Sequence, residues 1–125
     1  MENYSQLNIL IVDDDETICQ ILQEYFLEEK FLAEYVLNGI DALKLLEEKS
    51  FDIVILNLNM PGLRGNEVLT IIKRKFPSLP VIMLSAQSAV SAVVECIKIG
   101  AVDYLTKPFD YDELLECIIR YFDRK

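Results

Sequence analysis

Four clusters of polar side chains interrupt this sequence, and each cluster directly follows a short apolar run. The clusters contain carboxylates, amides, a hydroxyl and a lysine, which are Asp13, Asp14 and Asp15, then Asn57 and Asn59, then Ser85, and finally Lys107. Mg²⁺ prefers oxygen ligands of this kind. A hydroxyl and a lysine beside such a cation can hold the oxygens of a phosphoryl group. If the fold brings the clusters together, they indicate a site for phosphoryl transfer.

Other chemistry is excluded by composition. The chain has no histidine, which excludes a Ser-His-Asp triad, a Cys-His dyad and histidine-ligated zinc. Cys19, Cys96 and Cys117 are widely spaced within apolar helical patterns, so we expect buried thiols in a reducing compartment. The net charge of −9 argues against direct nucleic-acid binding, because phosphate backbones repel an acidic surface.

The length and the apolar content predict one folded domain over residues 1–125. Hydrophobic residues make up 52% of the chain and charged residues 26%, a balance that is typical of a globular protein rather than a disordered one. No apolar run reaches the roughly 18 residues that a membrane helix needs. The first residues also lack the pattern of a signal peptide. We therefore expect no membrane association and a cytoplasmic location.

The elements that must position the polar clusters alternate regularly. Apolar runs at 8–12, 32–37, 53–56, 81–84 and 103–105 are separated by segments whose apolar residues recur at helical spacing. This alternation predicts an α/β fold, a (βα)₅ doubly wound parallel sheet with helices on both faces. In such sheets the ligand site lies beyond the carboxyl ends of the strands, where the four clusters stand.

Four motifs, taken in order, resemble the receiver domain of two-component response regulators. They are Ile9-Leu-Ile-Val-Asp-Asp-Asp15, Asn57-Leu-Asn-Met-Pro61 followed by Gly65, Val81-Ile-Met-Leu-Ser-Ala86, and Tyr104-Leu-Thr-Lys-Pro-Phe109. The similarity covers essentially the whole chain, and residues 92–108 look closest to receivers of the nitrogen-regulator class. The resemblance implies the flavodoxin-like strand order 2-1-3-4-5. It also implies a histidine kinase as the phosphodonor partner.

The resemblance further implies a role for each cluster. The matching positions are Asp13, Asp14, residue 57 and the backbone carbonyl of Asn59 for Mg²⁺, and Ser85 and Lys107 for the phosphoryl oxygens. The bond between Lys107 and Pro108 is expected to be cis. Such a domain is not an enzyme acting on other substrates, although a receiver assists its own phosphorylation and dephosphorylation.

The sequence departs from the family at the phosphoacceptor position, where Asn57 replaces the aspartate. An amide has no anionic oxygen to attack phosphorus, so this route to an acyl phosphate is excluded. Mg²⁺ should bind weakly or not at all, because the site loses a carboxylate ligand. Two origins fit: an engineered substitution that keeps the unphosphorylated state, or a natural pseudo-receiver that acts as a protein-binding module without phosphorylation.

Two further features concern signalling. Tyr104 matches the family's aromatic switch residue, and because no covalent phosphate can form, we expect it to point towards solvent. Residues 90–97 are unusually apolar, with Glu95 as their one charge. Part of this segment must face the sheet, and the remainder could instead contact a partner. In the family, the face made by the fourth helix, fifth strand and fifth helix contacts an output domain, a partner protein or a second copy.

Overall fold

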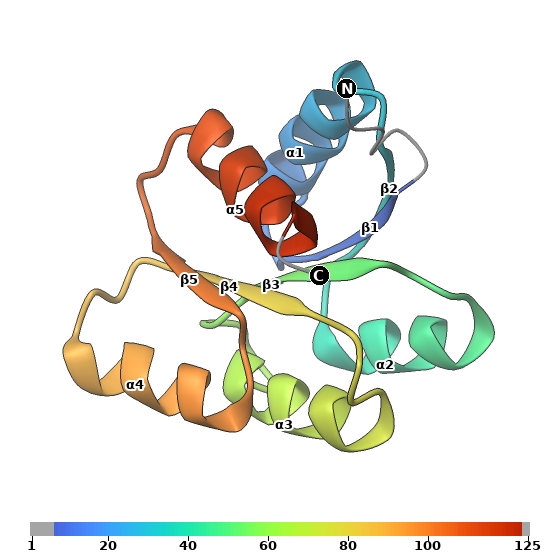
Figure 1. Cartoon of the computed structure of the whole chain (residues 1–125). Helices are drawn as coiled ribbons and strands as arrows, with labels where there is room; N and C mark the ends of the chain where they lie inside the picture. Colours follow the sequence, from blue (N-terminus) through green and yellow to red (C-terminus); the bar gives the residue numbers. More distant parts are fainter. Residues whose placement is uncertain (1–6, 124–125) are drawn as a thin grey trace.

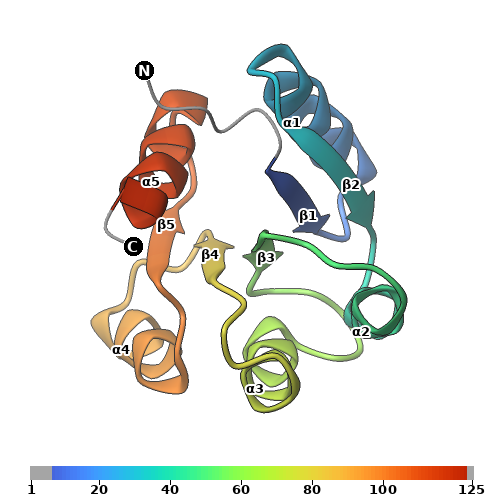
Figure 2. The ribbon, with the colours of Figure 1, turned by 45° about the vertical axis from the view of Figure 1, so that its right-hand side comes forward.

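The computed structural model describes residues 7–123, in which five parallel strands lie between two layers of helices (Figures 1 and 2). The elements in chain order are β1 (Asn8–Val12), α1 (Glu16–Glu28), β2 (Leu32–Val36), α2 (Gly39–Glu48), β3 (Ile53–Asn57), α3 (Gly65–Lys75), β4 (Val81–Ser85), α4 (Val90–Ile99), β5 (Asp103–Thr106) and α5 (Tyr111–Asp123). Helices α1 and α5 cover one face of the sheet, and α2, α3 and α4 cover the other. The predicted alternation is confirmed.

The strands pair in the order β2-β1-β3-β4-β5, so the order implied by the resemblance is confirmed. Strand β1 pairs with β2 on one side and with β3 on the other. The direction in which successive strands are added to the sheet therefore reverses between β1 and β3. Three strands run one residue further than predicted, to Asn57, Ser85 and Thr106. The parallel ladder causes this extension, since Asn57 pairs with Leu84 and Ser85 pairs with Thr106.

Side chains alternate between two apolar clusters, one on each face of the sheet. Within β1, Leu10 and Val12 belong to one cluster, whereas Ile9 and Ile11 belong to the other. Strands β3 and β4 are buried throughout, which explains why their sequences are continuously apolar. Strand β2 is at the edge of the sheet, and its exposed Leu32 accounts for its mixed pattern.

The three cysteines are free and buried, in line with the expectation of buried thiols. Burial raises the pKa of Cys19 to about 12 and, together with Asp103, raises the pKa of Cys117 to about 11. These thiols are therefore neutral near pH 7 and poorly nucleophilic.

Local capping sets the loop that follows β1. The side chain of Asp15 accepts a hydrogen bond from the backbone N–H of Ile18 at 3.2 Å, which makes Asp15 the N-cap of α1. The backbone N–H of Asp15 in turn donates to Asp13 Oδ1 at 3.0 Å. Asp15 thus caps the start of α1, and its backbone N–H holds the carboxylate of Asp13 at the end of β1.

The described residues 7–123 contain no helix with the length and apolar character needed to cross a membrane.

Candidate functional site

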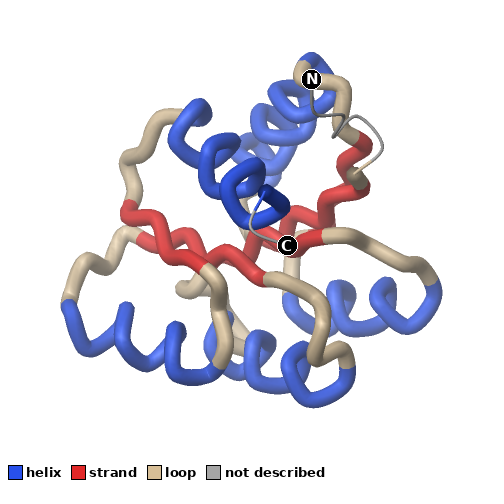
Figure 3. Tube along the Cα trace, in the orientation of Figure 1, coloured by secondary structure: helices blue, strands red, loops and turns tan. Residues whose placement is uncertain are grey.

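The predicted site residues meet at the carboxyl ends of the strands, where the loops after β4 and β5 lie side by side at the left of Figure 3. The ammonium of Lys107, just after β5, lies 3.3 Å from Asp13 Oδ2 and 3.5 Å from Asn57 Oδ1. Asp13 and Asn57 are almost completely buried, with exposed fractions of 2% and 6%. Residues at the carboxyl ends of β1, β3 and β5 therefore share one small polar site, as the strand-end positions predicted.

The amide of Asn57 has a defined orientation within this site. Its Nδ2 donates to the backbone carbonyl of Asn59 at 3.0 Å, to Asp14 Oδ1 at 3.3 Å and to Asp13 Oδ1 at 3.4 Å. Its Oδ1 faces the ammonium of Lys107. Exchanging the two amide atoms would place a donor against an ammonium and an acceptor against two carboxylates. Both sides of the site therefore favour the same orientation.

This arrangement bears directly on Mg²⁺. The oxygens of Asp13, Asp14 and Asn59 that could serve as ligands converge on one position, but the amide nitrogen of Asn57 already occupies it. A cation there would need the amide oxygen to turn inwards, away from Lys107. Within the described part of the chain, no three Asp, Glu, His or Cys side chains are grouped to hold a metal ion. As oriented, these residues do not fit a resident Mg²⁺.

Asp13 is the buried charge of the site. Desolvation by burial raises the pKa of its carboxyl above the ordinary value. The hydrogen bond from the Asp15 backbone and the nearby Lys107 ammonium act in the opposite direction. Lys107 therefore compensates part of the cost of burying Asp13.

A second set of contacts links the β3–α3 loop to the β4–α4 loop. Ser85, fully buried, accepts hydrogen bonds at Oγ from the backbone N–H of Gln87 at 2.9 Å and from Asn59 Nδ2 at 3.3 Å. The side chain of Gln87 donates from Nε2 to Asn59 Oδ1 at 3.1 Å. Gln87 was missed by sequence reasoning, because a polar residue in a loop gives no sign of a partner 28 positions earlier.

The prediction that Tyr104 points towards solvent is wrong. Its side chain is partly buried and packs against the apolar cluster on the α2–α4 face of the sheet. Its hydroxyl donates to the backbone carbonyl of Gln87 at 2.8 Å. The ring thus gains apolar contacts while the hydroxyl keeps a hydrogen-bond partner, which is the usual arrangement for a buried tyrosine.

A model of the family described as "Response regulator receiver domain" matches residues 9–119. This chain belongs to the response regulator receiver family. Receiver domains work with histidine kinases and with output domains, so those two classes of partner apply to the family as a whole.

Curated relatives place this receiver among regulators of the nitrogen-regulator class. The transcriptional regulatory protein ZraR of Klebsiella oxytoca is 42% identical over 109 residues, which are 87% of this chain and 25% of the relative. The putative response regulator NtrX-like of Rickettsia conorii is 38% identical over 118 residues, or 93% of this chain and 25% of the relative. The chain thus spans about a quarter of the length of these relatives.

Solved receiver structures share the fold over nearly the whole chain. The Francisella response regulator 1452 receiver domain is 34% identical and superposes with a TM-score of 0.88. The alignment covers 96% of this chain and all of that one. The BeF3-activated receiver domain of DrrB is 32% identical, with a TM-score of 0.85 over 94% of this chain and 98% of that one.

Two backbone features shape the receiver's site. The bond between Lys107 and Pro108 is cis, as predicted. Gly65 begins α3 where a side chain has no room, because a Cβ atom there would lie 2.4 Å from the carbonyl oxygen of Asn57 and 2.6 Å from the Cα of Leu58. Its backbone N–H donates to the carbonyl of Leu58 at 2.9 Å. Gly65 therefore allows α3 to start directly against the end of β3.

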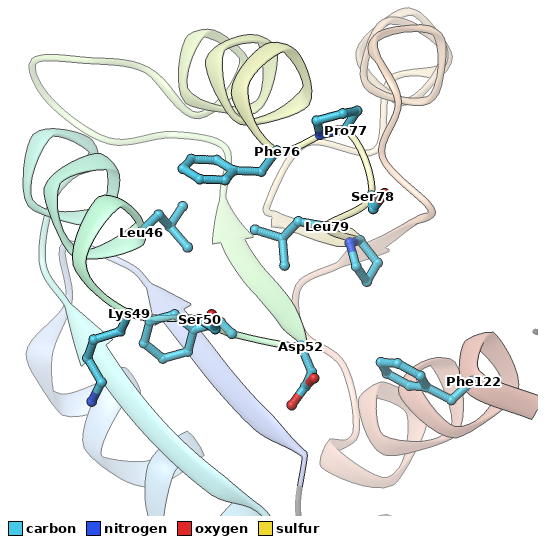
Figure 4. Close-up of a pocket in the computed structure, with 11 residues that line it drawn as sticks. Leu46, Lys49, Ser50, Asp52, Phe76, Pro77, Ser78, Leu79 and Phe122 are labelled. Atoms are coloured by element: carbon cyan, nitrogen blue, oxygen red, sulfur yellow. The ribbon is translucent and has the colours of Figure 1, made fainter.

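The receiver also has a cavity of about 510 Å³ at the opposite, amino ends of the strands (Figure 4). Leu46, Phe76 and Leu79 line one part of it, and Phe122 of α5 approaches from another side. None of the predicted site residues lines this cavity. The cavity lies where loops and helix ends come together, whereas the polar site lies at the carboxyl ends of the strands.

Proposed function

We propose that this domain is a phosphorylation-silent receiver that presents one fixed state to its partners. With an aspartate at residue 57 it would accept a phosphoryl group from a histidine kinase in a Mg²⁺-dependent reaction. With Asn57 the chain lacks the carboxylate nucleophile. The observation that carries the proposal is the Asn57 amide, whose nitrogen faces three would-be cation ligands.

The remaining residues keep the roles that the family assigns to them. Lys107 and Ser85 would contact phosphoryl oxygens, and Asp13, Asp14 and the carbonyl of Asn59 would face the cation. A carboxylate at residue 57 would supply both the nucleophile and the third acidic ligand. Whether Asn57 is natural or engineered, the chemical consequence for this chain is the same. The domain would catalyse no reaction on other molecules.

The test is treatment with a small phosphodonor such as acetyl phosphate in Mg²⁺, followed by intact-mass measurement of the protein. The chain with Asn57 should gain no phosphoryl group, whereas Asn57→Asp should form an acyl phosphate that hydroxylamine removes. Asn57→Ala is the matched control, since it also lacks the nucleophile but removes the amide. A phosphoryl group mapped to residue 57 of the unmodified chain, with the asparagine intact, would contradict the proposal.

A second candidate is a pseudo-receiver that binds a partner protein, or a second copy, without phosphorylation. The favouring observation is α4, in which Cys96 is the one buried residue and the side chain of Val90 is 75% exposed. Val94 and Ile97 add exposed apolar surface on the same helix. Sedimentation of the chain at increasing concentration would test self-association. Dimers weakened by Val94→Lys would favour this candidate, and a monomer at all concentrations would exclude the homodimer.

A further inference from the structure

The contacts around Gln87 suggest why Tyr104 is not exposed in a chain that carries no phosphate. Tyr104 lies on β5, and its hydroxyl donates a hydrogen bond to the backbone carbonyl of Gln87. That carbonyl belongs to the loop between β4 and α4. The contacts that hold Gln87 in place therefore bear on the position of the hydroxyl, in addition to the apolar packing of the ring.

Gln87 is held at two points. Its backbone N–H donates to Ser85 Oγ, a turn-like contact within its own loop. Its side-chain amide donates to Asn59, which lies in a different loop, after β3. Asn59 also donates from Nδ2 to Ser85 Oγ. These three side chains thus form a bridge between two loops, which we call the Asn59–Gln87 bridge.

The bridge is continuous with the phosphoacceptor position. The backbone carbonyl of Asn59 accepts from the amide of Asn57, and the side chain of Asn59 bonds to both Ser85 and Gln87. A chain of hydrogen bonds therefore runs from Asn57 to Tyr104 through neutral amides and a hydroxyl. Each contact is available without a charged ligand in the site.

We infer that Asn59 and Gln87 are positioning residues that hold Tyr104 in its inward position without phosphate, through the Asn59–Gln87 bridge. The surface formed by α4 and β5 then keeps the arrangement with Tyr104 inward while residue 57 carries no phosphate. The inference rests on the fixed state of the proposed function, but its test differs, because the contacts of the bridge contain no atom of the residue 57 side chain.

Fluorine NMR of the full chain carrying 3-fluorotyrosine tests this inference. The chain has six tyrosines, and Tyr104→Phe identifies the resonance of Tyr104. In Asn59→Ala and in Gln87→Ala, that resonance should shift towards the value of an exposed tyrosine and become more sensitive to a soluble paramagnetic agent. Loss of one net hydrogen bond changes such an equilibrium by about fivefold.

Control variants separate a local change at Tyr104 from a general loss of structure in the domain. Gln20→Ala removes another glutamine contact, from Nε2 to the Tyr35 hydroxyl at 3.4 Å, and should leave the Tyr104 resonance unchanged. The resonance of Tyr35, which donates to Glu16, should not move in the bridge variants. The double variant Asn59→Ala/Gln87→Ala should match Asn59→Ala, because Asn59→Ala already removes the contact between the two side chains.

Two results would overturn the inference. One is a Tyr104 resonance that stays in place in both single variants, which would mean that apolar packing alone holds the ring. The other is a double variant whose shift equals the sum of the two single shifts, which would mean that the residues act separately. Neither result depends on the phosphodonor experiment, which tests residue 57 alone.

Discussion

The two ends of the sheet differ in how they treat their polar groups. At the carboxyl ends, Asp13, Asn57 and Lys107 come from three strands and are within hydrogen-bonding reach of one another. At the amino ends, charged groups pair separately with near neighbours: Lys49 binds Glu34 in an exposed ion pair, and Asp52 accepts the backbone N–H of Asn8 at 2.7 Å. The first end is a shared network, and the second is a set of independent pairs.

This difference shows that cavity volume is a poor guide to function in this receiver. The amino end has the cavity of about 510 Å³, yet its charges have no common target. At the carboxyl end, Asp13, Asn57 and Ser85 are buried polar residues, and the Asn57 amide is hydrogen-bonded to the groups around it. Burial makes each interaction there stronger and each unpaired group more costly. Substitutions should therefore have larger effects at the carboxyl end.

The largest effect is expected for Gly65→Ala. The added methyl group would overlap backbone atoms of Asn57 and Leu58, which cannot move without displacing β3. We expect a loss of about 3 kcal/mol in the free energy of unfolding, measured by urea denaturation. Gly62→Ala is the control in the same loop: its φ is +79°, but nothing lies within 4 Å, so strain of about 1 kcal/mol is expected. Equal losses would show that space at Gly65 is not limiting.

The next effect compares two lysines. Lys107→Met leaves Asp13 buried without its cation, and we expect a loss of about 2 kcal/mol at pH 7. Lys49→Met removes an ion pair whose side chains are 46% and 39% exposed, so a loss of at most about 0.5 kcal/mol is expected. Urea denaturation of both variants measures the difference. If Lys49→Met cost as much as Lys107→Met, the contrast between the two ends would be wrong.

The smallest effect concerns the charge at residue 57. In EDTA, Asn57→Asp should be less stable than the unmodified chain by about 1 kcal/mol, because a third carboxylate joins Asp13 and Asp14. Adding Mg²⁺ should restore this stability to Asn57→Asp, since a ligand that binds the folded state stabilises it. The unmodified chain and Asn57→Ala should respond little to Mg²⁺. Equal stabilisation of all three proteins would show that a carboxylate at residue 57 is not needed to bind the cation.

Much of this architecture could be predicted from local patterns. Alternation of apolar runs and helical stripes predicted the elements, and the strand-end positions predicted which polar residues would meet. Strand order was implied by family resemblance, because a run of residues does not encode which side of β1 the next strand joins. The continuous apolar character of β3 and β4 predicted burial on both faces, which the structure confirms.

Tyr104 marks where this reasoning failed. The prediction considered the absent phosphate alone, whereas the position of the ring depends on an apolar cluster and on a carbonyl in another loop. Gln87 was not singled out for the same reason. Its importance comes from Asn59, which is distant in the chain and close in space.

The sequence by itself determined that residue 57 lacks a nucleophile, since this follows from the chemistry of an amide. Only the tertiary structure decided which way that amide points. Carboxylates after β1 and a carbonyl after β3 attract its nitrogen, and the ammonium after β5 attracts its oxygen. These groups act together because parallel strands end at the same edge of the sheet, where side chains far apart in the chain come within hydrogen-bonding distance.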